Sequence, residues 1–164
     1  MKTEFKEVQE FRQWWIWLLL SPLIIFILIV IIYQLILGHE IGDKPMPDLA
    51  AWIFVIVGLS LLYFIYYLQL RTTINKDGIS FSYRPVLKRN YNWRDIDRVE
   101  IIDYGFVGYG FRWWPKHGWI YNVGGRMGLK VHLKNEKFFT IGTQKTEDLK
   151  IALNNLKIDY SSTE

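Results

Sequence analysis

Two long stretches without charged side chains dominate the first half of the sequence. Residues 13–37 and residues 49–70 contain no Asp, Glu, Lys, Arg or His. Each exceeds the roughly 20 apolar residues that a helix needs to cross about 30 Å of hydrocarbon. Two buried core helices of this kind would require a larger core than a chain of 164 residues can build. The sequence therefore predicts two transmembrane helices that form a hairpin.

Aromatic residues flank these stretches, as is typical of helices that end at the headgroup level. Trp14 and Trp15 lie at the start of the first stretch, and Tyr66 and Tyr67 lie at the end of the second. A cleaved signal peptide is the rival interpretation of the first stretch. The apolar stretch is too long for one, the residues before it carry no net positive charge, and no small-residue cleavage site follows. The hairpin is therefore the preferred interpretation.

The basic residues predict the orientation of the hairpin. Residues 1–12, an N-terminal segment, hold three Lys or Arg, whereas the loop at 38–48 holds only Lys44. Five more follow the second stretch: Arg71, Lys76, Arg84, Lys88 and Arg89. Because cytoplasmic flanks are enriched in Lys and Arg, we expect both termini in the cytoplasm and the loop outside.

From residue 71 the hydrophobic period changes to two. Residues 79–83 and 129–134 alternate completely between apolar and polar side chains, which predicts strands with one buried face. Further short strands are expected at 86–93, 99–104, 110–114, 119–123 and 138–142. Strands of this length and spacing predict a β-barrel or β-sandwich.

A helix is expected to close this domain, which we place at residues 71–158. Thr146 is the predicted N-cap, with Glu147 and Asp148 in the first turn. Leu149, Ala152, Leu153 and Leu156 then form an apolar stripe at helical spacing, which the open end of a barrel would cover. The polar tail at 159–164 is expected to be frayed.

Charge and cysteine content narrow the function classes. The chain has no cysteine, which excludes disulfides, thiolate catalysis and cysteine-bound metals. Residues 71–164 carry sixteen Lys or Arg against ten Asp or Glu, a net charge of +6. These cations are spread along strands rather than clustered. Attachment to a membrane therefore favours anionic lipid over nucleic acid as their counterpart.

The order of the motifs after the hairpin resembles the bacterial pleckstrin-homology-like (PH-like) domains found directly after one or two membrane helices. The residues that carry the resemblance lie at 78–85, 92–96, 108–112, 118–123 and 141–149. One departure is Thr146, where these domains have proline. The resemblance implies a membrane α-helical hairpin followed by an all-β PH-like barrel capped by a C-terminal α-helix. It also implies location in a bacterial plasma membrane and no catalytic activity.

The motif content of the sequence also favours a protein without catalytic activity. The sequence contains no G-x-S-x-G, H-E-x-x-H or P-loop motif. Asp95 and Asp97 are neighbouring carboxylates, but the adjacent Arg94 and Arg98 explain them as surface ion pairs. His39 and the acidic residues of the 38–48 loop match no metal-ligand spacing. We therefore expect a non-enzymatic protein without catalytic residues, cofactor or metal.

The most distinctive segment spans residues 104–126, which are rich in glycine, tryptophan and cations. Its candidate lipid or ligand contacts are Arg112, Trp113, Trp114, Lys116, His117 and Arg126. Rings beside cations suit a headgroup-level surface, because rings enter the interface while cations meet phosphates. Two other interpretations stay open. The cations can bind a small anion or a protein, or the segment is a structural hairpin whose tryptophans fill the core.

These observations favour an integral membrane protein whose cytoplasmic PH-like domain is a protein-interaction module. The expected partner is another protein or a second copy of the chain, with anionic lipid as an auxiliary contact. PH-like domains often bind peptides by adding a strand to an open sheet edge. An anionic-lipid-binding or membrane-sensing protein is the first alternative. An accessory subunit of a transporter is the second, although neither apolar stretch carries an ionisable residue that would mark an ion path.

Overall fold

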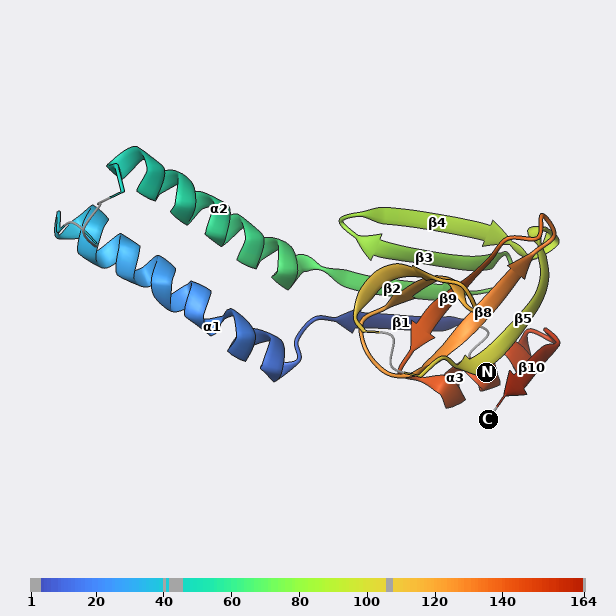
Figure 1. Ribbon diagram of the computed structural model, residues 1–164. Coiled ribbons are helices and arrows are strands. Elements are labelled where there is room, and N and C mark those ends of the chain that lie inside the picture. Colours follow the sequence, from blue (N-terminus) through green and yellow to red (C-terminus); the bar gives the residue numbers. More distant parts are fainter. Residues whose placement is uncertain (1–3, 40, 42–45, 106–107, 164) are drawn as a thin grey trace. The chain divides into compact units, whose positions relative to one another are not determined.

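The computed structural model describes residues 4–39, 41, 46–105 and 108–163 and divides into two compact units (Figure 1). The helical unit comprises Phe11–Tyr67. The β unit combines the N-terminal residues up to Glu10 with the chain from Leu68 onward. The N-terminal residues therefore belong to the β unit, although the sequence analysis treated residues 1–12 as a segment of their own.

The helical unit contains the two predicted apolar helices. Helix α1 spans Trp14–Ile29 and continues as the π-helical turn η1 at Val30–Ile36, and α2 spans Asp48–Tyr67. Both helices are long and apolar enough to cross a membrane. Only 11% and 17% of the most apolar 18-residue stretch of each span is buried inside the structure. A core helix of a soluble protein would be mostly buried. The exposed apolar surface of these helices therefore suits lipid better than water.

A small apolar core holds the two helices together. Ile27 and Val30 pack against Ala51 and Val55, and all four side chains are buried. At the end of this core, Gln34 Nε2 donates hydrogen bonds to the backbone oxygen of Met46 at 2.5 Å and to Asp48 Oδ1 at 3.3 Å. The polar group of Gln34 is thus satisfied inside the unit. Five residues of the predicted polar loop, 40 and 42–45, lie outside the described residues.

Within the described residues, the β unit contains two open sheets, one α-helix and one short 3-10 helix. The first sheet is antiparallel and runs in the order β1 (Phe5–Glu10), β2 (Gln69–Ile74), β3 (Gly78–Arg84), β4 (Leu87–Asn92). The second runs in the order β10 (Tyr160–Thr163), β5 (Ile96–Asp103), β8 (Met127–Leu133), β9 (Phe138–Thr143), β7 (Gly118–Asn122), β6 (Gly110–Trp114). The short helix η2 (Trp93–Asp95) connects β4 to β5, and α3 (Thr146–Asn155) lies between β9 and β10.

Aromatic side chains fill the space between the sheets. The fully buried Phe81 ring of β3 lies 5.4 Å from the Phe139 ring of β9 and 4.8 Å from the Tyr121 ring of β7, measured between centroids. Tyr91 of β4 stacks on Phe139 at 4.7 Å. This aromatic core explains why so many strands alternate between aromatic or branched and polar residues.

Strand β1 was not predicted, and its burial pattern gives the reason. Its buried side chains are Phe5, Glu7 and Gln9, whereas Val8 is exposed. Polar residues thus occupy the inward face, so the hydrophobic alternation that marks an ordinary strand is reversed. Hydrogen bonds pair two polar groups on this face: Gln9 Nε2 donates to the Gly142 oxygen at 2.7 Å, and Glu7 accepts from Thr143 Oγ1 at 2.6 Å.

Two predictions about the C-terminal region are wrong. The tail is not frayed, because Tyr160–Thr163 forms β10, which pairs in parallel with β5 from Val99 onward. Helix α3 begins at Thr146, but its N-cap residue is Lys145. The Lys145 side chain forms no capping hydrogen bond. The Lys145 backbone N–H instead donates to Thr143 Oγ1 at 3.1 Å. The predicted apolar stripe is correct for Leu149, Ala152 and Leu153, which are buried.

Candidate functional site

The hairpin of β6 and β7 carries most of the sequence-predicted contacts. The two strands pair from Gly110↔Asn122 to Trp114↔Gly118. Strand β7 begins at Gly118, directly after the turn of the hairpin, and this position requires glycine. Its φ is +69°, and a Cβ atom there would lie 2.3 Å from the Phe138 backbone oxygen. This tight approach joins the hairpin to the neighbouring strand β9.

Strand geometry divides the predicted residues between the two faces of the sheet. Successive side chains of a strand point to opposite faces, so Arg112 and Trp114 share one face of β6 while Phe111 and Trp113 share the other. Phe111 faces the space between the sheets, because its ring lies 5.8 Å from the Tyr83 ring. The exposed fractions of Trp113, Trp114 and Trp119 are 59%, 46% and 47%. These tryptophans therefore do not fill the core.

The structure does not bring all six candidate contacts together. Arg126 precedes β8 and forms an ion pair with Asp103, with 2.6 Å between Arg126 Nη2 and Asp103 Oδ2. In the sheet register, the start of β8 lies beside Thr143 at the end of β9, whereas Trp119 lies beside Phe139 near its start. Four residues of a strand span roughly 13 Å. Arg126 therefore lies near the end of the sheet away from Trp114 and Lys116.

His117 is buried rather than presented to solvent. Its backbone oxygen accepts a hydrogen bond from Thr140 Oγ1 at 2.9 Å, while its Nδ1 has no hydrogen-bond partner among the described residues. Burial lowers the pKa of His117, and the charges of Lys130 and Lys116 lower it further. The neutral imidazole is therefore the favoured form in the folded protein.

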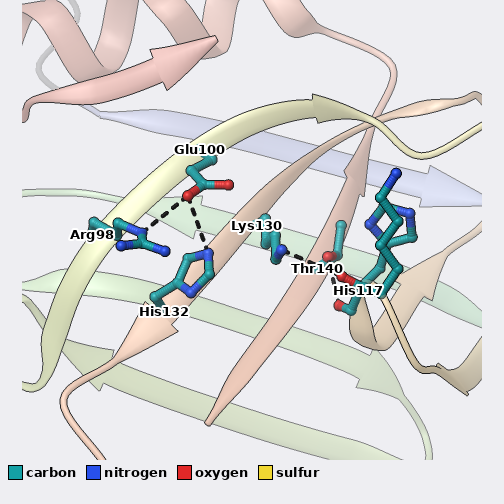
Figure 2. A network of polar contacts seen from close by, with 7 residues as sticks. Arg98, Glu100, His117, Lys130, His132 and Thr140 are labelled. Carbon is teal, nitrogen blue, oxygen red and sulfur yellow. Dashed lines mark hydrogen bonds and ion pairs between the residues drawn. The ribbon is translucent and has the colours of Figure 1, made fainter. Parts of the chain in front are cut away.

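A polar network covers the outer face of the second sheet beside His117. Figure 2 shows Glu100 in contact with Arg98 and His132, and Lys130 between this group and His117. Glu100 Oε1 lies 3.0 Å from Arg98 Nε and 3.3 Å from His132 Nε2, and Lys130 Nζ donates to the Lys116 oxygen at 3.3 Å. Burial lowers the pKa of His132, and Glu100 opposes this shift. The face is thus basic, with one carboxylate among its cations.

A cleft with aromatic walls opens on the opposite side of the second sheet, where that sheet diverges from β4. Its volume is about 460 Å³. Leu87, Arg89 and Tyr91 of β4 line one side, and Phe111, Trp119 and Tyr121 of the hairpin line the other. Lys137, from the turn before β9, also lines it.

Sequence reasoning did not single out Arg89 or Lys137. The strand predicted at 86–93 did contain a usable signal, because Arg89 lies two residues from each of the apolar residues Leu87 and Tyr91 and therefore shares their face of the strand. A cation at an inward position of a strand often marks a binding surface. The register confirms the position, since Arg89 pairs with the buried Phe81.

Among the described residues, no group of three or more His, Cys, Asp or Glu side chains is placed to hold a metal ion. Aromatic rings, cations and the edge strands of two open sheets are present in this part of the chain. Neither a known protein-family model nor a curated protein matches the sequence.

Proposed function

We propose that this chain is a non-enzymatic membrane protein whose β unit docks a protein partner, or a second copy of the chain, at the cytoplasmic face of a bacterial plasma membrane. The observation that carries the proposal is the edge strand β6. It is the last strand of the second sheet within the described part of the chain. Its Trp113 and Trp114 side chains are exposed.

An open edge with apolar side chains is a binding surface unless the protein protects it. Unpaired backbone N–H and C=O groups can accept another strand, and soluble proteins commonly block such edges with charges, proline or a covering segment. Strand β6 has a single charged residue, Arg112, whose Nη2 donates to the Tyr109 oxygen at 2.7 Å. Pairing with a partner strand would supply main-chain hydrogen bonds, and the exposed rings would supply apolar contact.

The membrane part of the proposal draws on both units. The two candidate spans are exposed and apolar. Strand β1 precedes the first span and pairs with β2, which follows the second, from Phe5↔Ile74 to Glu10↔Gln69. Two crossings return the chain to the side where it started, and this is the arrangement that the β1–β2 pairing requires. The distribution of Lys and Arg supports the cytoplasm as that side.

The PH-like character of the β unit is part of the same proposal. Two open sheets followed by a helix with a buried apolar stripe are compatible with it. Closure of the sheets into a barrel is not seen, because the cleft separates β4 from the β6–β7 hairpin.

Anionic lipid is the second candidate partner, and the outer face of the second sheet favours it. Arg112 and Trp114 lie on that face of β6, and Lys130 and Arg98 extend the positive charge across it. A ring beside several cations suits a phosphate-rich surface.

Photo-crosslinking in cells of the source bacterium distinguishes the two partners. A photoreactive phenylalanine analogue replaces Trp113 at the β6 edge, and the matched control replaces Ile151, an exposed apolar residue of α3. We expect a protein adduct at position 113 but not at position 151. Adducts with lipid alone would support the lipid alternative, and the absence of any specific adduct at position 113 would contradict docking at β6.

A further inference from the structure

We infer that the aromatic cleft between β4 and the β6–β7 hairpin binds a small anionic amphiphile, a molecule with a flat or extended apolar body and one carboxylate, sulfate or phosphate group. This site is distinct from the β6 edge, because ligand contact here is made by inward-facing side chains rather than by free backbone groups. It goes beyond the proposed docking function and does not depend on it.

The walls of the cleft suit an apolar body. Tyr91, Phe111, Trp119 and Tyr121 contribute rings from three strands that belong to two different sheets. Phe139, buried at the base, stacks on Tyr91 and is the innermost of the lining rings. Rings on opposing walls can hold a flat or extended molecule by stacking and edge contacts. The volume of about 460 Å³ lies within the range of roughly 300–1,000 Å³ that small-molecule sites occupy.

Two cations at this cleft supply the complementary charge. Arg89 lies on the inward face of β4, and Lys137 comes from the turn before β9. Within the described residues, neither side chain forms an ion pair or a hydrogen bond. Burial raises the pKa of Tyr121, which also lines the cleft, and the charge of Arg89 opposes this rise. Among the described residues that line the cleft, none is an Asp or Glu that could neutralise the two cations.

The combination selects one class of ligand. An apolar molecule without charge would leave both cations without an anionic partner. A highly charged hydrophilic anion would leave the rings without apolar contact. A single anionic group on an apolar body satisfies both parts of the cleft, and a guanidinium can bind a carboxylate or phosphate with two parallel hydrogen bonds.

The test uses full-length protein in nanodiscs of zwitterionic lipid and two probes of matched shape. The probes are 2-naphthoate, which is anionic, and 2-naphthamide, which is not. Binding is measured by isothermal titration calorimetry, with empty nanodiscs as the blank. We expect 2-naphthoate to bind at least about tenfold more tightly than 2-naphthamide, the discrimination that one charge-assisted contact provides.

Charge-matched variants locate the binding. The double variant Arg89→Gln with Lys137→Gln should lose about tenfold or more in affinity for 2-naphthoate and little for 2-naphthamide. The control, Arg94→Gln with Lys134→Gln, removes two exposed cations that do not line the cleft. Trp119→Ala should weaken both probes. Equal affinities for the two probes, or equal losses in the two double variants, would overturn the proposal, whereas crosslinking at Trp113 tests docking separately.

Discussion

Glu7 and Thr143 are 136 positions apart in the sequence, yet Thr143 Oγ1 donates a 2.6 Å hydrogen bond to Glu7 Oε2. The other oxygen, Glu7 Oε1, accepts from the Gln144 backbone N–H at 2.8 Å. Thr143 Oγ1 in turn accepts from the Lys145 N–H at the start of α3. Glu7, which precedes the first apolar helix in the sequence, thereby stabilises the junction between β9 and α3.

Removal of the Glu7 side chain should therefore destabilise the β unit. Glu7→Ala leaves the buried Thr143 hydroxyl and the Gln144 N–H without their acceptor, and we expect a loss of about 2–3 kcal/mol in the free energy of unfolding. Denaturant titration of the full chain in detergent, followed by tryptophan fluorescence, measures it. Glu4→Ala, which removes only an exposed ion pair with Lys6, should cost less than about 1 kcal/mol. Equal losses would contradict the role of Glu7.

Two glycines with the same backbone conformation give a second prediction. Gly118 and Gly105 have φ values of +69° and +68°, but only at Gly118 would a Cβ atom meet another part of the chain, the Phe138 oxygen at 2.3 Å. Gly105→Ala should cost about 1–2 kcal/mol from backbone strain alone. Gly118→Ala should cost clearly more, because the β7–β9 contact must also shift. Thermal unfolding of both variants tests this, and identical melting temperatures would refute the close contact.

Helix α3 provides a third prediction, on its buried stripe. Leu153 is fully buried, so Leu153→Ala should lower the free energy of unfolding by about 2–5 kcal/mol through the cavity it leaves. Ile151→Ala, two residues away on the exposed face, should change it by no more than about 0.5 kcal/mol. The same denaturant titration compares the two variants. A large effect at position 151 would show that its face of α3 is covered.

The buried histidine predicts loss of stability in acid. The pKa of His117 lies below its ordinary value of 6.5 because burial, with the charges of Lys130 and Lys116, disfavours the imidazolium. As the pH falls below about 6.5, His117 therefore binds a proton in the unfolded chain before it does so in the folded chain. The free energy of unfolding should decrease until the pH reaches the lower pKa of the folded state.

Replacement of His117 should flatten this part of the pH profile. His117→Asn removes the titrating group, so stability should depend less on pH below 6.5 than in the wild type. His39→Asn, the same change in the helical unit, should leave the slope for the β unit unaltered. Unfolding measured at half-unit pH intervals provides the comparison. An unchanged slope in His117→Asn would show that other groups control the acid response.

The candidate site was only partly predictable. The β6–β7 region stands out in the sequence because aromatic rings and cations are close together there. Because side chains alternate along a strand, Arg112 and Trp113 lie on different faces of β6. Arg126 forms an ion pair with Asp103 near the opposite end of the sheet. The cleft instead combines Arg89 with Trp119 and Lys137, which come from separate strands and turns. Their proximity depends on sheet order, which residue spacing does not encode.

Elements whose cause is local could be predicted from the residues alone. The absence of charge over 13–37 and 49–70 defines the apolar helices, and strict alternation defines strands such as β3 and β8. The roles of β1 and β10 instead depend on contacts between distant parts of the chain. The inward face of β1 is polar and acceptable only because β9 supplies partners for Glu7 and Gln9. The polar tail becomes a strand only because the edge of β5 is available for pairing. In both cases a distant strand, absent from the local pattern, satisfies the hydrogen bonds.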